Sequence, residues 1–128
     1  MLRTRLGLEI KTKSLLYGAS LGASLLFTGS AAETYAAIAY NKATGLYGFS
    51  KGYDTREEAE ERAAQECGPG CETILWGCDS CVALATAGNH ADGSGWDTDQ
   101  ESANQTAMNG CSGYADDCEI VVEVCSDD

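Results

Sequence analysis

The chain has 128 residues, the length of one domain, and carries 8 Lys and Arg against 20 Asp and Glu, a formal net charge of −12 at pH 7. So acidic a composition excludes nucleic-acid binding, which needs basic residues against phosphate, and it disfavours contact with an anionic membrane surface. Seven cysteines in so short a chain exclude a disordered linker and a coiled coil, and they indicate an exported protein held by disulfides.

Residues 1–32 are predicted to be a cleavable secretory signal peptide. Four basic residues between Arg3 and Lys13 precede an apolar run over 15–27, which is shorter than the roughly 20 residues that span a bilayer. Small residues then favour cleavage after Ala32 rather than retention as a membrane anchor. We therefore expect a secreted or periplasmic protein with no membrane span after cleavage. The remaining part, 33–128, keeps four basic and 19 acidic residues, a net charge of −15.

The first elements predicted after the signal peptide are a hairpin, a helix and a strand. Residues 36–40 and 46–50 form the arms of the hairpin. Thr55 and Glu58 then form a capping box, which starts a helix. Small residues four apart place one narrow face of this helix against a sheet. They are Ala59, Ala63 and Cys67. The strand is predicted over 71–78.

The same order of elements recurs in the second half of the chain. A strand over 82–86 is expected to enter a polar loop over 88–95. Gly95–Thr98 repeats the pattern of Gly52–Thr55, and a capping box from Thr98 to Glu101 is expected to start the second helix. Its small face repeats that of the first helix: Ala103, Ala107 and Cys111. The last strand is predicted over 118–125, where apolar residues alternate with glutamates.

This repeat predicts one small α+β domain over residues 33–128. It is a duplicated β-β-α-β unit, with repeat one at about 35–80 and repeat two at about 81–128, an antiparallel sheet and two short helices. Equivalent positions predict the local disulfides Cys67–Cys71 and Cys111–Cys118. A third disulfide, with Cys125 as one partner, is expected to link the two repeats. By repeat count Cys78 aligns with Cys125, so that a Cys78–Cys125 bridge stays open.

Several stretches resemble the secreted bacterial family called domain of unknown function 4189. They are Ala36–Tyr40, Thr44–Gly48, the Glu- and Ala-rich helix ending in Cys67, and Cys81–Ala85. The resemblance implies a small exported α+β domain with disulfides and no established enzymatic activity, and it supplies no catalytic residues. It also implies Cys81 as the partner of Cys125, which leaves Cys78 as a free or redox-active thiol.

Cys78 and Cys81 also form a Cys-x-x-Cys motif, which is the arrangement used for thiol–disulfide exchange. Asp79 lies inside the motif and would raise the pKa of the thiols, which slows their attack on a disulfide. A zinc site from these two residues with Cys67 and Cys71 is disfavoured, because the second repeat lacks a matching motif and the compartment oxidises thiols.

The remaining polar candidates are weak, and we expect no metal and no cofactor. His90 has no accompanying nucleophile motif and is expected to be a solvated loop residue. The acidic stretch from Asp92 to Glu101, which includes Asp97 and Asp99, does not have the spacing of an EF-hand. Calcium binding by this stretch stays an open question.

Aromatic side chains are expected to supply a binding face. Its residues are Tyr47, Phe49, Tyr53 and Trp96. We predict a secreted or periplasmic, non-catalytic interaction module that binds a protein or envelope partner, and the charge of −15 favours a cationic one. The alternatives are a thiol–disulfide oxidoreductase that uses Cys78 and Cys81, and a structural cell-envelope component, for instance a dimer linked through Cys78.

Overall fold

The computed structural model describes residues 32–128 of the protein. The signal peptide predicted for residues 1–32 lies, apart from its last residue, outside this part. Residues 32–128 contain six strands and two helices: β1 Tyr35–Tyr40, β2 Tyr47–Tyr53, α1 Arg56–Cys67, β3 Glu72–Cys78, β4 Cys81–Thr86, β5 Asp92–Asp97, α2 Gln100–Ser112 and β6 Glu119–Cys125. Neither helix in this range has both the length and the apolar character needed to cross a membrane.

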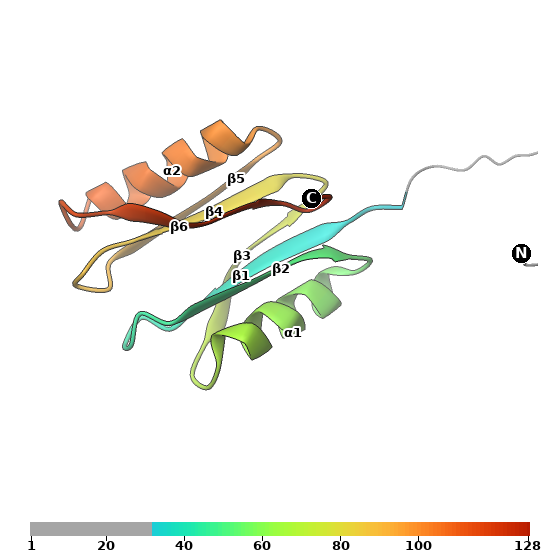
Figure 1. Ribbon diagram of the computed structural model, residues 1–128, viewed down its shortest axis with the longest axis horizontal. Helices are drawn as coiled ribbons and strands as arrows, with labels where there is room; N and C mark the ends of the chain where they lie inside the picture. The colour runs from blue at the N-terminus through green and yellow to red at the C-terminus, as the bar shows by residue number, and fades with distance from the viewer. Residues whose placement is uncertain (1–31) are drawn as a thin grey trace, which may run out of the picture. The chain divides into compact units, whose positions relative to one another are not determined.

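The strands form two antiparallel three-stranded sheets, one from each repeat. Their orders are β2-β1-β3 and β5-β4-β6, so the two repeats have the same β-β-α-β topology. The sheets lie face to face, with α1 outside one and α2 outside the other (Figure 1). The prediction of a duplicated α+β fold is confirmed, and the sheet part is a two-sheet sandwich.

The central strands β1 and β4 are buried on both faces, which explains why they contain almost no polar residues. On β1, Ile38 and Tyr40 face the other sheet, while Ala37 and Ala39 face α1. The equivalent Val82 and Leu84 of β4 complete the core between the sheets. Small residues face the helices because each helix lies very close to its sheet.

Two glycines permit this close approach. A Cβ on Gly48 would overlap the backbone of α1 at Ala63 and Cys67. A Cβ on Gly93 would meet the backbone of α2 in the same way. The faces of small residues predicted for the two helices are therefore buried. The face of α1 packs on Gly48 of β2, and the face of α2 packs on Gly93 of β5.

The prediction of a polar loop over residues 88–95 is wrong for the second half of this range. Residues 92–97 form β5, which pairs with β4 from Thr86↔Asp92 to Cys81↔Asp97. Its sequence, DGSGWD, lacks the branched residues typical of strands. The strand forms because Gly93 and Gly95 are buried against α2, where larger side chains would clash.

The start of α2 also differs from the prediction. Asp99, not Thr98, is the N-cap, and its carboxylate accepts a hydrogen bond from the Ser102 amide at 2.9 Å. The helix therefore begins one residue later than expected, because an aspartate is at least as good a cap as a threonine. The predicted cap of α1 is correct, since the Thr55 hydroxyl accepts from the Glu58 amide at 3.2 Å.

Candidate functional site

The described cysteines form three disulfides and leave one thiol. Two join helix ends to the following strands, Cys67–Cys71 and Cys111–Cys118. The third, Cys81–Cys125, joins β4 to β6. Both of its partners belong to repeat two, so it does not link the repeats, which corrects that expectation. Cys78 is free and half-buried.

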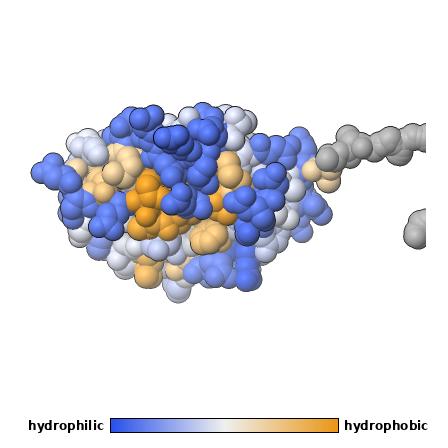
Figure 2. Space-filling model, turned by 45° about the horizontal axis from the view of Figure 1, so that its top comes forward, coloured by the Kyte–Doolittle hydropathy of each residue, from blue (hydrophilic) through white to orange (hydrophobic). Residues whose placement is uncertain are grey.

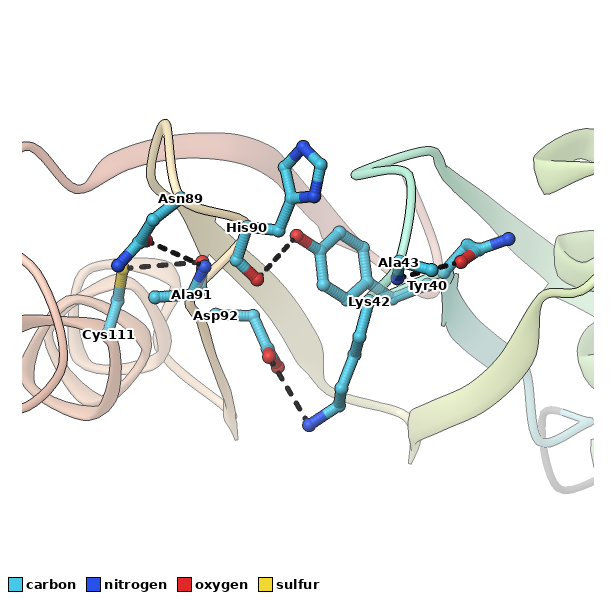
Figure 3. A network of polar contacts seen from close by, with 9 residues as sticks. Tyr40, Lys42, Ala43, Asn89, His90, Ala91, Asp92 and Cys111 are labelled. Carbon is cyan, nitrogen blue, oxygen red and sulfur yellow. Dashed lines mark hydrogen bonds and ion pairs between the residues drawn. The ribbon is translucent and has the colours of Figure 1, made fainter.

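A hydrogen bond and an ion pair join the two repeats at the strand ends far from Cys81–Cys125. The Tyr40 hydroxyl donates to the His90 carbonyl at 3.0 Å, and the Lys42 ammonium lies 3.4 Å from the Asp92 carboxylate (Figure 3). His90 also donates its backbone amide to the Ala87 carbonyl at 2.9 Å. These bonds assign His90 a backbone role in holding the loop between β4 and β5 against the first repeat.

The acidic stretch from Asp92 to Glu101 is not assembled into one cluster. Asp92 pairs with Lys42, whereas Asp97 accepts a hydrogen bond from the Asp99 amide at 3.1 Å and Asp99 caps α2. Among residues 32–128, one set of three acidic or thiol side chains brings its ligand atoms within 4.8 Å of one another: Glu33, Cys78 and Asp79. These atoms could hold a divalent cation, but both carboxylates are exposed and equally open to a basic side chain.

Burial and negative charge make the free thiol of Cys78 a weak nucleophile. Burial is the main cause that raises the pKa of Cys78, and the charges of Glu33 and Asp79 raise it further. A hydrogen bond with Tyr35 acts in the opposite direction. The same hydrogen bond, followed by burial and the nearby negative charges, raises the pKa of Tyr35 to about 12.

An apolar groove runs along the outer edge of β3. It has a volume of about 430 Å³ and is lined by Ile74, Leu75, Trp76, Gly77 and Cys78 of β3 and by Trp96 of β5. Trp96 is 58% exposed and Trp76 is 37% exposed. The Arg56 guanidinium lies 4.4 Å from the centroid of the Trp76 ring. One tryptophan from each repeat therefore borders the same groove.

The sequence pattern did not predict this groove, because the groove depends on a β-bulge in β3. β3 pairs with β1 through Ile38↔Leu75 and then Ala39↔Thr73, which leaves Ile74 as an extra residue. Ile74 and Leu75 consequently both pack towards the core between the sheets. Strict alternation would have placed them on opposite faces. The apolar residues 74–76 before Gly77 are the one feature of the sequence that indicates an apolar surface on this strand.

The four aromatic residues predicted as a binding face do not lie together. Tyr47 and Phe49 are on β2, an edge strand of the first sheet. Figure 2 shows hydrophobic residues gathered in the middle of one face of the molecule, with hydrophilic ones around them. Trp96 is on β5, which is the edge strand of the other sheet and lies next to β3. The two groups therefore occupy opposite edges of the sandwich.

A register shift separates Tyr53 from Trp96, although the sequence repeat aligns them. β2 contains an additional residue at the bulge near Gly52, whose φ is +77°. Tyr53 pairs with Tyr35 and packs against the α1 layer, whereas Trp96 pairs with Val82 on the face turned to the other sheet. The position that matches Trp96 in the first repeat is thus occupied by the bulge.

The sequence model of the family called Domain of unknown function (DUF4189) matches residues 35–125. The chain belongs to the DUF4189 family. The DUF4189 match begins with β1 and ends with β6, so that it includes both repeats, all seven cysteines and the groove between β3 and β5. Neither a curated protein nor a solved structure matches the chain.

Proposed function

We propose that the protein is a secreted or periplasmic, non-catalytic interaction domain that binds a cationic protein partner. The observation that carries this proposal is the exposure of large aromatic side chains on a strongly acidic, cross-linked scaffold. Trp96 is 58% exposed at one edge of the sandwich, and Tyr47 and Phe49 are each 41% exposed at the other. Aromatic side chains in such positions commonly anchor protein interfaces.

The charge distribution supports a basic partner. Residues 33–128 have four basic side chains against 19 acidic ones. Ion pairs engage Lys42 with Asp92, Arg56 with Glu60 and Arg62 with Glu66, so that little positive charge is left to offset the rest. An excess of negative charge accelerates encounter with a cationic protein and repels acidic ones.

The three disulfides support a function outside the cytoplasm. Disulfides persist in oxidising compartments, and they are common in small exported domains that have a thin core. Here two of them fix the helix ends and one fixes a strand pair, so that the binding surfaces are held on a rigid frame. A rigid frame lowers the entropy cost of binding.

The arrangement of the thiols favours binding over thiol–disulfide exchange. Cys81 is bonded to Cys125 and not to Cys78, so the Cys-x-x-Cys motif does not form a reactive pair. The raised pKa of Cys78 also keeps it protonated, whereas exchange uses the thiolate.

The test is the salt dependence of partner binding. The exported protein is cross-linked to proteins of its own compartment, the partners are identified, and their affinities are measured between about 50 and 500 mM salt. We expect basic partners whose dissociation constants rise about tenfold or more over this range, because screening removes the electrostatic attraction. Binding that is unchanged by salt, or selection of acidic partners, would contradict the proposal.

A further inference from the structure

We propose that the outer edge of β3 is a strand-addition site for an extended, basic segment of the partner protein. An apolar side chain of this segment enters the groove against Trp96, and a Lys or Arg side chain binds between Glu33 and Asp79. The inference rests on the proposed function, since it names the surface that the cationic partner uses and the kind of segment that fits it.

The lining of the groove points to main-chain recognition. Five consecutive residues of β3, 74–78, line it. After the bulge at Ile74, successive side chains from Leu75 to Cys78 point to opposite faces, so the whole run can border one groove only along the strand's edge, where the backbone is reached. β3 ends its sheet, and no strand among residues 32–128 pairs with that edge. Unpaired backbone groups of this kind accept an added strand.

β3 has a bulge at Ile74, but its residues beside the groove carry no charge. Charged side chains and bulges normally prevent an edge from pairing with other chains. β2 has Lys51 beside its bulge, β5 begins and ends with an aspartate, and β6 contains Glu119 and Glu123. β3 has one charged residue, Glu72 at its first position, so the strand residues that line the groove are themselves uncharged.

The groove favours an apolar side chain. Ile74 and Leu75 contribute partly buried aliphatic surface continuous with the core between the sheets. The half-exposed Trp96 forms the opposite wall and would lose water from its ring when a side chain inserts. Burying aromatic and aliphatic area in this way supplies most of the affinity of a short extended segment.

The charges at the end of the groove favour a basic residue. Glu33 and Asp79 bring their carboxylate oxygens near the Cys78 sulfur, within 4.8 Å. Arg56, which lies over the Trp76 ring of β3, is already engaged by Glu60 at 3.0 Å. A second copy of this chain fits poorly, because it would bring another −15 charges to an acidic edge.

The geometry also sets the spacing within the bound segment. Leu75 and Cys78 are three residues apart on β3, which corresponds to about 10 Å along a strand. We therefore expect the basic residue about three positions from the apolar one. A segment with this spacing presents the two side chains to opposite faces of the added strand, as the groove and the carboxylate pair require.

The experiment is a screen of the exported protein against blocked ten-residue peptides with randomised positions, followed by affinity measurement of the enriched peptides. We expect enrichment of peptides that have an apolar residue and a Lys or Arg about three positions away. Trp96→Ala should weaken their binding about tenfold or more. Tyr114→Ala is the matched control, because it removes an exposed aromatic ring that does not line the groove and should leave the affinity unchanged.

Two further arms separate strand addition from simpler binding. N-methylation of the peptide amides one at a time should abolish binding at alternate positions, since only every second amide faces β3. Glu33→Gln combined with Asp79→Asn should remove the preference for Lys and Arg. Peptide binding that Trp96→Ala does not weaken, or that N-methylation weakens without a period of two, would overturn the inference. Salt-dependent partner binding that survives Trp96→Ala would refute this site while leaving the proposed function intact.

Discussion

Tyr35 lies directly opposite Cys78 on β1 and β3, at the register position that the disulfide Cys81–Cys125 occupies on β4 and β6. Both strand pairs continue through three further matched pairs and then have a bulge in the same place. Cys78 is therefore the structural equivalent of Cys125, and Tyr35 stands where the second repeat has a cysteine. Cys78 is unpaired because the residue opposite it, Tyr35, is a tyrosine where the second repeat has Cys81.

Tyr35→Cys should create a fourth disulfide with Cys78. The chain-entropy model gives on the order of 4 kcal/mol for a loop of this length, from which the lost packing of Tyr35 on Trp76 must be subtracted. The measurement is alkylation of the unreduced protein, in which Cys78 should become inaccessible, together with urea unfolding before and after mild reduction. Two free thiols in the oxidised variant would show that the strand ends are not equivalent.

Alkylation of Cys78 should be slow at pH 8 and should accelerate above pH 9. Its pKa is raised from the ordinary value of 9.0, and the thiolate is the form that reacts. Asp79→Asn removes a negative charge but keeps the acceptor oxygen for the Thr34 amide, so it should lower the pKa and speed the reaction. Tyr35→Phe removes a hydrogen bond that lowers the pKa, so it should shift the rate profile to higher pH. The same profile for all three proteins would contradict these causes.

Gly48→Ala and Gly93→Ala should each destabilise the fold by about 3 kcal/mol, because the added methyl group must push a helix away from its sheet. Gly113→Ala is the control. Gly113 follows α2 with helical dihedral angles, and the nearest atom to an added Cβ is 3.6 Å away, so the change should be less than about 1 kcal/mol. Urea unfolding of the three variants, with disulfides intact, measures the difference. Equal stability of all three would mean that the helices do not lie this close.

Asp99→Ala should cost about 1 kcal/mol of stability, since it removes the acceptor for the Ser102 amide at the start of α2. Thr98→Ala should cost much less, because its hydroxyl bonds only the neighbouring Asp97 carboxylate at 3.4 Å. Thermal unfolding of the two variants checks the assignment of the cap. A larger loss with Thr98→Ala would restore the cap position read from the sequence.

Several features were readable from the residues because their cause is local. The capping box at Thr55 needs only neighbouring residues, and the four-residue spacing of Ala59, Ala63 and Cys67 follows from the helical period. Repetition of this pattern 44 residues later indicates a second copy of the same unit. The central strands are apolar throughout because they are covered on both sides, and this signal is also contained in a short window.

Other features depend on contacts between distant residues. β5 is a strand because β4 pairs with it and α2 covers Gly93, although its own residues disfavour a strand. Trp96 pairs with Val82 because β5 has no bulge, whereas the bulge in β2 displaces Tyr53 from the equivalent position. Neither the β5 strand nor the register of Trp96 can be predicted from a local pattern. Both depend on which strands pair and on how closely a helix packs on its sheet.

The sequence by itself determined the duplicated α+β unit, the acidic surface and the local disulfides, since composition, helical period and short spacings carry that information. Only the tertiary structure decided that each repeat forms its own sheet, that Tyr35 faces Cys78, and that Trp76 and Trp96 border one groove. The physical reason is that a β-strand finds its neighbours through backbone hydrogen bonds, which are nearly independent of side-chain identity. Bulges and face-to-face packing then determine which side chains meet.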